Sequence, residues 1–342
     1  MSAAVPDKIL AGGQYAVLAE DRAAGGSPGE VTQIDRPVLR VQDLQVSFIQ
    51  YTAGLRQQGL QVINGLDVDV YPKEILAVVG ASGSGKSLLA HAILGILPVN
   101  ARVKGTIRYQ GEVLAEKRQA NLRGRKIALI PQSVNFLDPL MRVGQQVRTA
   151  VKEGQASERQ RQVFERFRLE KRVERLYPFQ LSGGMARRIL VAIALVSGAD
   201  LIIADEPTPG LDPAVLKEAL GHFRELADEG RAVMLITHDI DTALQIADRI
   251  AVFYAGSTLE VASVKDFSGT GERLRHPYSQ ALWRALPRNG FLPVPGFQPP
   301  PHDLPPGCLF EPRCPMATAE CRESRPQPRR LRGGMVRCIH AS

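Results

Sequence analysis

The glycine-rich segment at residues 80–87, Gly-Ala-Ser-Gly-Ser-Gly-Lys-Ser, constrains the fold of this chain more than any other feature. It follows the apolar run 75–79 and precedes the apolar residues 88–90. This order predicts a buried strand, a tight turn and the start of a helix. Such a turn directs backbone N–H groups and the positive end of the helix dipole toward phosphate oxygens. The segment therefore predicts an α/β fold with a nucleotide-phosphate site at the end of a strand.

Two side chains of this segment have the chemistry that a nucleoside triphosphate with Mg²⁺ requires. Lys86 is placed to reach the β- and γ-phosphates, and the Ser87 hydroxyl is placed to bind Mg²⁺. The remaining contacts that we expect with the nucleotide come from the turn: Gly80, Ser82, Gly83, Ser84 and Gly85.

Length and composition indicate a globular protein. The 342 residues give room for two domains, and 44% hydrophobic with 23% charged residues is ordinary for a globular chain. Apolar stretches such as 189–196 are far shorter than the roughly 20 residues that span a bilayer. The N-terminus has acidic and polar residues where a signal peptide has a basic start and an apolar run. We therefore expect a cytoplasmic protein without a membrane helix.

The net charge of +8 and the pI near 9.5 raise the question of a nucleic-acid partner. The arginines of 159–175 are mixed with glutamates, and those of 325–332 lie in a tail. No aromatic residues alternate with them to stack on bases. We therefore expect no nucleic-acid partner.

Hydrophobic patterning divides the chain into three parts. Residues 1–36 are rich in Ala, Gly and Asp and predict a loosely ordered extension. In 37–268, alternation over 38–48 and 60–70 predicts an antiparallel sheet, and 142–178 has helical composition. Residues 269–342 are rich in proline, contain all four cysteines and predict an appendage separate from the α/β core. Continuous apolar runs predict buried parallel strands at 127–130, 201–204, 233–236 and 250–254.

Polar residues that follow three of these strands are the expected catalytic groups. Asp205 is placed to hold Mg²⁺, and Glu206 to orient the attacking water or accept its proton. His238 is placed to donate a hydrogen bond to the γ-phosphate. Gln132 is placed to contact the metal-bound or attacking water, so we count it with both the catalytic and the Mg²⁺ residues.

The segment Leu181-Ser182-Gly183-Gly184-Met185 predicts a second anion-binding turn at the start of a helix. One chain cannot easily wrap both this turn and the 80–87 turn around a single nucleotide. We therefore expect a head-to-tail dimer, with each γ-phosphate held between the 80–87 turn of one subunit and Ser182, Gly183 and Gly184 of the other.

With these motifs in this order, residues 38–265 resemble an ABC-type ATPase subunit. The resemblance implies an ABC-type P-loop ATPase core over 37–268, with an antiparallel β subdomain and a helical signature subdomain, followed by the cysteine-containing appendage. It implies that ATP closes the dimer and hydrolysis opens it. It also implies that Phe48, or Tyr51 as the second choice, stacks on adenine and that Asp212 lies at the dimer interface.

The C-terminal third resembles the oligopeptide/dipeptide/nickel import branch of that family. The segments that carry this resemblance are 276–282 and 305–315, with Met185 in support. Arg187 departs from the glutamine that is common in the branch. The branch implies a second, paralogous ATPase subunit, two permease subunits, an external substrate-binding protein and a peripheral position on the cytoplasmic face of the inner membrane.

The four cysteines, Cys308, Cys314, Cys321 and Cys338, have the spacing C-x5-C-x6-C-x16-C. In a cytosolic protein they are not expected to form disulfides, and thiolate clusters of this number suit zinc or an iron–sulfur cluster. The resemblance to the import branch favours a 4Fe–4S cluster over Zn²⁺ or free thiols. His340 is an alternative ligand.

The sequence therefore predicts an ATP-hydrolysing subunit of a peptide importer. Two other functions stay open at this point. One is the import of nickel or a metal chelate, and the other is a regulatory or repair ATPase that works without a permease.

Overall fold

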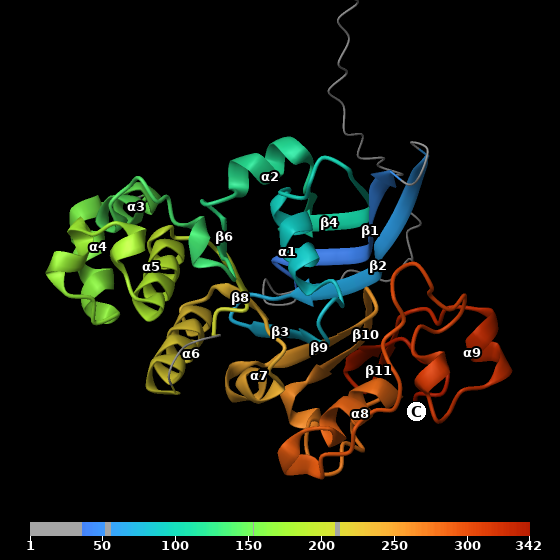
Figure 1. Ribbon diagram of the computed structural model, residues 1–342. Helices are drawn as coiled ribbons and strands as arrows, with labels where there is room; N and C mark the ends of the chain where they lie inside the picture. Colours follow the sequence, from blue (N-terminus) through green and yellow to red (C-terminus); the bar gives the residue numbers. More distant parts are fainter. Residues whose placement is uncertain (1–35, 52–55, 153, 209–212) are drawn as a thin grey trace, which may run out of the picture.

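Two sheets organise the chain in the computed structural model, which describes residues 36–51, 56–152, 154–208 and 213–342 (Figure 1). Within these residues, the first sheet is four-stranded and antiparallel, in the order β2-β1-β4-β5. This confirms the antiparallel subdomain predicted from the alternating residues. Its strands are β1 (Leu39–Tyr51), β2 (Gln57–Val70), β4 (Ala101–Tyr109) and β5 (Glu112–Val113).

The second sheet has the order β11-β12-β10-β9-β3-β8-β7-β6 among the described residues. Its strands from β9 to β6 are parallel, as the apolar runs predicted, and β10, β12 and β11 pair antiparallel at one end. The parallel strands are β3 (Ile75–Gly80), β6 (Ile127–Ile130), β7 (Leu201–Asp205), β8 (Ala232–Ile236) and β9 (Arg249–Tyr254). The antiparallel strands are β10 (Ser257–Ser263), β11 (Arg329–Leu331) and β12 (Gly334–Val336).

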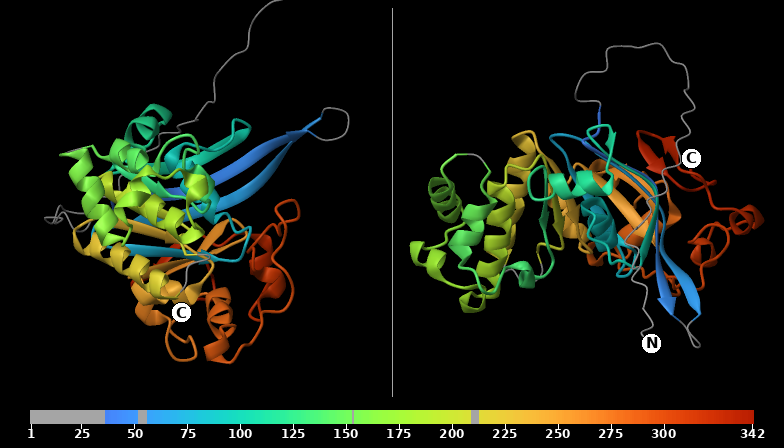
Figure 2. Two further views of the ribbon diagram at one scale, coloured as in Figure 1. Left: turned by 60° about the vertical axis from the view of Figure 1, so that its left-hand side comes forward. Right: turned by 90° about the horizontal axis from the view of Figure 1, so that it is seen from above.

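Three helices form a body beside the sheets, which we call the helical body: α3 (Val143–Ala150), α4 (Ala156–Arg166) and α5 (Gly183–Val196). It lies at the opposite end of the molecule from the C-terminal segment (Figure 2). The other described α-helices are α1 (Lys86–Leu94), α2 (Glu116–Leu122), α6 (Pro213–Asp228), α7 (Ile240–Ile246), α8 (Pro277–Arg284) and α9 (Ala319–Glu323). Short 3₁₀ turns span Val134–Phe136, Lys171–Arg175, Pro178–Gln180, Val264–Asp266, Pro287–Asn289 and Glu311–Arg313.

The central strand β3 separates two apolar cores. Ile75, Ala77 and Val79 pack into the core on the side of the helical body, whereas Leu76 and Val78 pack into the core under the antiparallel sheet. Successive side chains of a strand point to opposite faces, so an uninterrupted apolar run supplies both cores. This burial fixes the strand whose carboxyl end carries the 80–87 turn.

The C-terminal segment is less separate from the core than its composition predicts. Strands β11 and β12 extend the second sheet beyond β10, and Tyr278 and Phe310 belong to the apolar core on the side of the helical body. The physical reason is that a proline-rich segment has few apolar residues of its own, so it buries them against the existing core. No helix of the described residues is long and apolar enough to cross a membrane.

Candidate nucleotide site

The expected catalytic residues meet at one edge of the second sheet. Strands β3, β8, β7 and β6 are neighbours and run parallel, so their carboxyl ends lie together. The 80–87 turn follows β3, and the other groups follow their strands at the same edge. A cavity of about 360 Å³ opens there. Its lining is Val62, Ser82, Gly83, Gly85, Lys86, Ser87, Leu88, Gln132, Glu206 and His238.

The backbone of the 80–87 turn has the form of an anion cradle. Gly85 precedes α1 with φ 94° and supplies no side-chain cap, so the first N–H groups of α1 remain free to bind an anion. A Cβ on Gly80 would lie 2.4 Å from the Phe253 carbonyl oxygen, which explains the need for glycine there. The buried Ser84 hydroxyl has no hydrogen-bond partner among the described residues. These features fit a bound phosphate group.

Lys86 is held at the base of this cradle. Its Nζ donates hydrogen bonds to the carbonyl oxygens of Gly80 at 2.9 Å and Ala81 at 3.1 Å. Burial lowers the pKa of this ammonium group, while the nearby carboxylates of Glu206 and Asp205 oppose the shift. The charged amine is therefore poorly solvated, and an anionic ligand compensates for that cost.

Oxygen ligands suited to Mg²⁺ lie next to the cradle. The Ser87 hydroxyl donates a hydrogen bond to Asp205 Oδ1 at 3.1 Å, and Asp205 is buried. Burial raises the pKa of Asp205, and the Ser87 hydrogen bond opposes part of that shift. A hydroxyl and a carboxylate from two different elements are the donors that Mg²⁺ prefers, so these residues fit the metal.

Glu206 is the centre of the expected catalytic group. Its Oε2 accepts a hydrogen bond from Gln132 Nε2 at 3.3 Å, and its Oε1 lies 3.2 Å from His238 Nδ1. Its backbone has φ 44°, in the left-handed region that non-glycine residues rarely adopt. A carboxylate held this way at the cavity wall can orient a water molecule or accept a proton from it.

The residues expected to contact a partner's nucleotide lie away from this cavity. Ser182 is the N-cap of α5, and its side chain accepts a hydrogen bond from the Met185 backbone N–H at 3.2 Å. A Cβ on Gly183 or Gly184 would meet no atom within 4 Å. None of the three lines the cavity that contains Lys86. Ser182 and Gly183 are exposed and Gly184 is half-buried, so the turn presents the start of α5 to solvent.

The residue expected to stack on adenine is not part of this cavity. Phe48 lies in β1 of the antiparallel sheet, opposite Leu60 and Ala101, and is half-buried against the core under that sheet. Tyr51 is exposed, and its hydroxyl accepts a hydrogen bond from Gln57 Nε2 at 3.1 Å. Neither residue lines the cavity, so the adenine contact stays a prediction. Asp212 lies outside the described residues.

Arg187 is a residue whose role the sequence did not reveal. It is buried in α5, and its Nη1 donates a hydrogen bond to the Pro131 carbonyl oxygen at 3.0 Å. Burial lowers its pKa. Because Pro131 directly precedes Gln132, this bond ties the helix that begins with the Ser-Gly-Gly turn to the Gln132 loop. The only sequence signal was an arginine at an unusual position.

The four cysteines gather in the C-terminal segment but do not form a metal-ligand set. The Cys308 backbone N–H donates to the Cys321 carbonyl oxygen at 2.8 Å, and Cys321 Sγ lies 3.4 Å from His340 Nε2. Burial, together with the nearness of the other three thiols, raises the pKa of Cys308 to about 11. Across the described residues, no group of three or more His, Cys, Asp or Glu side chains is arranged to hold a metal ion.

Two parts of the sequence match known protein families. Residues 63–209 match the family described as ABC transporter. Residues 259–321 match the oligopeptide/dipeptide transporter, C-terminal region. A solved dimeric bacterial ABC transporter cassette has the same fold, with a TM-score of 0.58 at 23% identity over 66% of this chain and 98% of that one.

Curated relatives extend the match over most of the chain. The oligopeptide transport ATP-binding protein of Salmonella typhimurium is 34% identical, covering 88% of this chain and 95% of that protein. The dipeptide transport ATP-binding protein of Bacillus subtilis is 36% identical, covering 83% and 88%. The Mycobacterium tuberculosis oligopeptide transport ATP-binding protein is 36% identical over 85% of this chain, which spans only 50% of that relative's length. This chain therefore belongs to the ABC transporter ATPases, in the family of the oligopeptide and dipeptide transport ATP-binding proteins.

Proposed function

We propose that this chain binds and hydrolyses ATP to power an importer of dipeptides or oligopeptides. The observation that carries the ATPase part is Glu206, held between Gln132 and His238 beside the Lys86 cradle. The peptide part is supported by the relatives named for oligopeptide and dipeptide transport and by the matching C-terminal region.

The chemistry follows from the residues at the strand ends. Lys86 and the N–H groups of the 80–87 turn bind the phosphates, and Glu206 orients the attacking water or accepts its proton. Gln132 and His238 hold the Glu206 carboxylate in place. Ser87 and Asp205, with Gln132, hold Mg²⁺. The metal neutralises charge on the phosphate oxygens when it is bound.

The active form in this proposal is a head-to-tail pair of ATPase subunits. Its support is that Ser182 and Gly183 are exposed, Gly184 is half-buried, and none of the three lines the cavity of its own chain. The second subunit is a paralogous chain. Phe48 stacks on the adenine ring.

The other partners are two permease subunits and an external substrate-binding protein. The chain then sits peripherally on the cytoplasmic face of the inner membrane. This placement agrees with a described structure in which no helix could span a bilayer. The cargo contacts the other components, so peptide length and sequence are selected there.

For the C-terminal segment we infer a 4Fe–4S cluster held by Cys308, Cys314, Cys321 and Cys338, with Zn²⁺ as the alternative. The support is that four free thiols lie in this segment and that the other three are near enough to Cys308 to raise its pKa. The thiols are not arranged as ligands in the described structure, so their side chains must turn to bind an ion. Elemental analysis of anaerobically purified protein tests this, and the absence of both iron and zinc would exclude it.

Co-purification from membranes with mass spectrometry of the associated chains tests the whole proposal. We expect two permeases, a related ATPase and a binding protein, with peptide-dependent ATPase activity of the complex. Stimulation by nickel or a metal chelate instead of peptides would replace the cargo assignment. A chain recovered without permeases, with ATPase activity stimulated by DNA or ribosomes, would refute the importer.

A further inference from the structure

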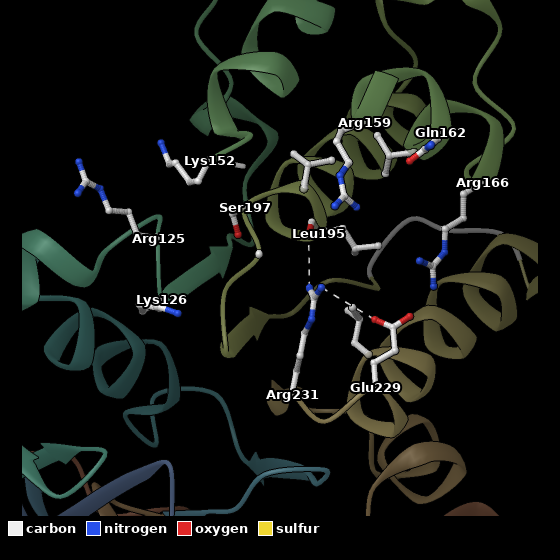
Figure 3. A pocket seen from close by; sticks show the side chains of 14 residues that line it. Arg125, Lys126, Lys152, Arg159, Gln162, Arg166, Leu195, Ser197, Glu229 and Arg231 are labelled. Carbon is white, nitrogen blue, oxygen red and sulfur yellow. Dashed lines mark hydrogen bonds and ion pairs between the residues drawn. The ribbon is translucent and has the colours of Figure 1, made fainter. Parts of the chain in front are cut away.

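A large basic cavity lies far from the nucleotide site, between the helical body and the core (Figure 3). Its volume is about 770 Å³. On the side of the second sheet, its lining includes Lys126 and Arg231, which directly precede β6 and β8 at the amino ends of these strands. The nucleotide cavity lies at their carboxyl ends, so the two cavities are at opposite edges of the sheet.

Positive charge dominates the lining. Among the lining residues, Glu229 is the one carboxylate and six are cationic. Arg159 and Arg166 extend from α4 toward the space that Arg231 enters from the opposite side (Figure 3). The cationic residues are Arg125, Lys126, Lys152, Arg159, Arg166 and Arg231.

Ion pairs account for only part of this charge. Lys126 Nζ lies 3.2 Å from Asp200 Oδ2, and Arg166 pairs with Glu225. Arg231 lies 3.9 Å from Glu229, at the limit of an ion pair. The lining cations that no carboxylate of the described residues pairs with are Arg125, Lys152 and Arg159.

Carbonyl groups at helix ends bind a second part of the positively charged lining. Carbonyl groups at the end of a helix attract cations. Arg231 donates to the Leu195 carbonyl oxygen near the end of α5, and Lys152 donates to Thr149 near the end of α3, both at 3.5 Å. Neither Arg125 nor Arg159 forms such a side-chain bond within the described ranges. The side chains of Arg125 and Arg159, which both line the cavity and are exposed, therefore remain available to an anion.

Three largely buried apolar side chains complete the lining of the cavity. Val163 of α4, Leu195 of α5 and Leu226 of α6 line it and are buried. A volume of this size falls in the range of small-molecule sites, about 300–1,000 Å³. Guanidinium groups match phosphate oxygens in a two-pronged geometry. The volume and the lining cations together suit a small molecule that carries several phosphate groups.

We propose that this cavity binds a small molecule with two or more phosphate groups, of the size of a nucleoside polyphosphate. This goes beyond the proposed transport function. Arg159 belongs to α4 of the helical body, and Arg125 lies just before β6 of the second sheet. The ligand therefore bridges the helical body and the second sheet. Helix α5 runs from this cavity at Leu195 to Ser182 at its other end. The ligand therefore fixes the position of the Ser-Gly-Gly turn relative to the nucleotide site.

The test is calorimetric titration of the full chain with inorganic tripolyphosphate, after its nucleotide site has been saturated with Mg²⁺ and a non-hydrolysable ATP analogue. We expect saturable binding, at least tenfold weaker in the double variant R125Q/R159Q. The matched control R161Q/R102Q removes two exposed arginines outside the cavity and should change the affinity less than twofold. Amide hydrogen exchange of 156–166 should slow when tripolyphosphate is bound.

Three results would overturn the proposal. The first is no binding to the unmodified protein at millimolar tripolyphosphate. The second is an equal loss of affinity in R161Q/R102Q, since this would indicate diffuse attraction to a basic surface. The third is capture by phosphatidylglycerol vesicles through Arg125 and Arg159 without any binding of tripolyphosphate, which would identify the cavity as a membrane contact.

Discussion

At the scale of single residues, the nucleotide site depends on how one carboxylate is held. Glu206 has a left-handed backbone, and its N–H donates to the Ile236 carbonyl oxygen at 2.9 Å. This bond joins β7 to β8 at the point where the strands end. The two carboxylate oxygens then face Gln132 and His238. Strain of this kind persists only where surrounding contacts hold it, as is common at catalytic positions.

Glu206→Gln should leave ATP binding intact and reduce turnover at least 100-fold, because the amide keeps the shape of the side chain but cannot accept a proton. Nucleotide binding and phosphate release by the assembled complex measure the two effects. Glu116→Gln, an exposed change on α2, is the matched control. A Glu206→Gln protein that hydrolyses ATP normally would show that another group acts as the base.

At the scale of elements, two helix starts carry distinct roles. Ser182 caps α5 with its hydroxyl, and His276 caps α8 by accepting a hydrogen bond from the Tyr278 N–H at 3.0 Å. The first cap is exposed at the surface that we assign to the partner subunit. The second is buried and joins the C-terminal segment to the core.

Ser182→Arg should spare ATP binding to the same chain and reduce hydrolysis by the assembled pair at least tenfold. The reason is that a long cation occupies the turn that completes the partner's site. Ser182→Asn keeps a capping acceptor and controls for loss of the helix cap. Binding of a fluorescent ATP analogue and steady-state ATPase rates separate the two effects. Full activity of the arginine variant would refute the composite site.

The buried cap should make stability depend on pH. Burial lowers the pKa of His276 to about 3 from the ordinary value of 6.5. The folded state therefore favours the neutral ring. Its contribution to the free energy of unfolding is fully present above about pH 6.5 and is lost as the pH falls toward 3. At pH 5 the loss should be about 2 kcal/mol. Denaturant unfolding at pH 7.5 and pH 5 measures it.

His276→Asn retains a cap acceptor without the titrating ring, so its free energy of unfolding should change less between these two pH values. The exposed His302→Asn variant should behave like the unmodified protein. Equal pH dependence in all three proteins would show that other groups cause the loss.

At the scale of the whole molecule, charged side chains fasten the C-terminal segment to the rest of the chain. Arg275 Nη1 lies 3.2 Å from Glu260 Oε1 and 3.0 Å from Asp266 Oδ2. Its side chain is 2% exposed, and that of Glu260 is 0% exposed. Arg337 of the tail also pairs with Asp67 of β2. The segment is therefore fixed to both sheets.

Glu260→Gln should reduce the free energy of unfolding by about 3 kcal/mol, the lower end of the range for breaking a buried pair. It removes the fully buried charge that faces Arg275, whereas Asp266 stays as a carboxylate partner of that arginine. Chemical denaturation measures this change. Glu158→Gln removes a charge from the exposed Arg161–Glu158 pair and should cost less than about 1 kcal/mol. Equal, small effects in both variants would show that the buried pair does not fasten the segment.

The strand-end residues could be predicted because each is defined by its own short stretch of sequence. Gln132, Asp205 and His238 follow apolar runs, and parallel strands bring their ends together. Arg187 could not be predicted in this way, because its partner Pro131 is distant in the chain and carries no distinctive pattern. The basic cavity escaped prediction for a related reason. Its cations come from four separate stretches of the sequence, so the sequence alone indicates only scattered surface charge.

The sequence by itself determined the strand, the turn and the helix start around residues 80–87, since local order fixes them without reference to the rest of the chain. It also determined the alternation that separates the antiparallel sheet from the parallel one. The tertiary structure alone decided that β11 and β12 extend the second sheet and that Arg125 and Arg159 line one cavity. Contacts between distant segments depend on which surfaces remain uncovered after the core has formed. Local sequence patterns do not predict which surfaces these are.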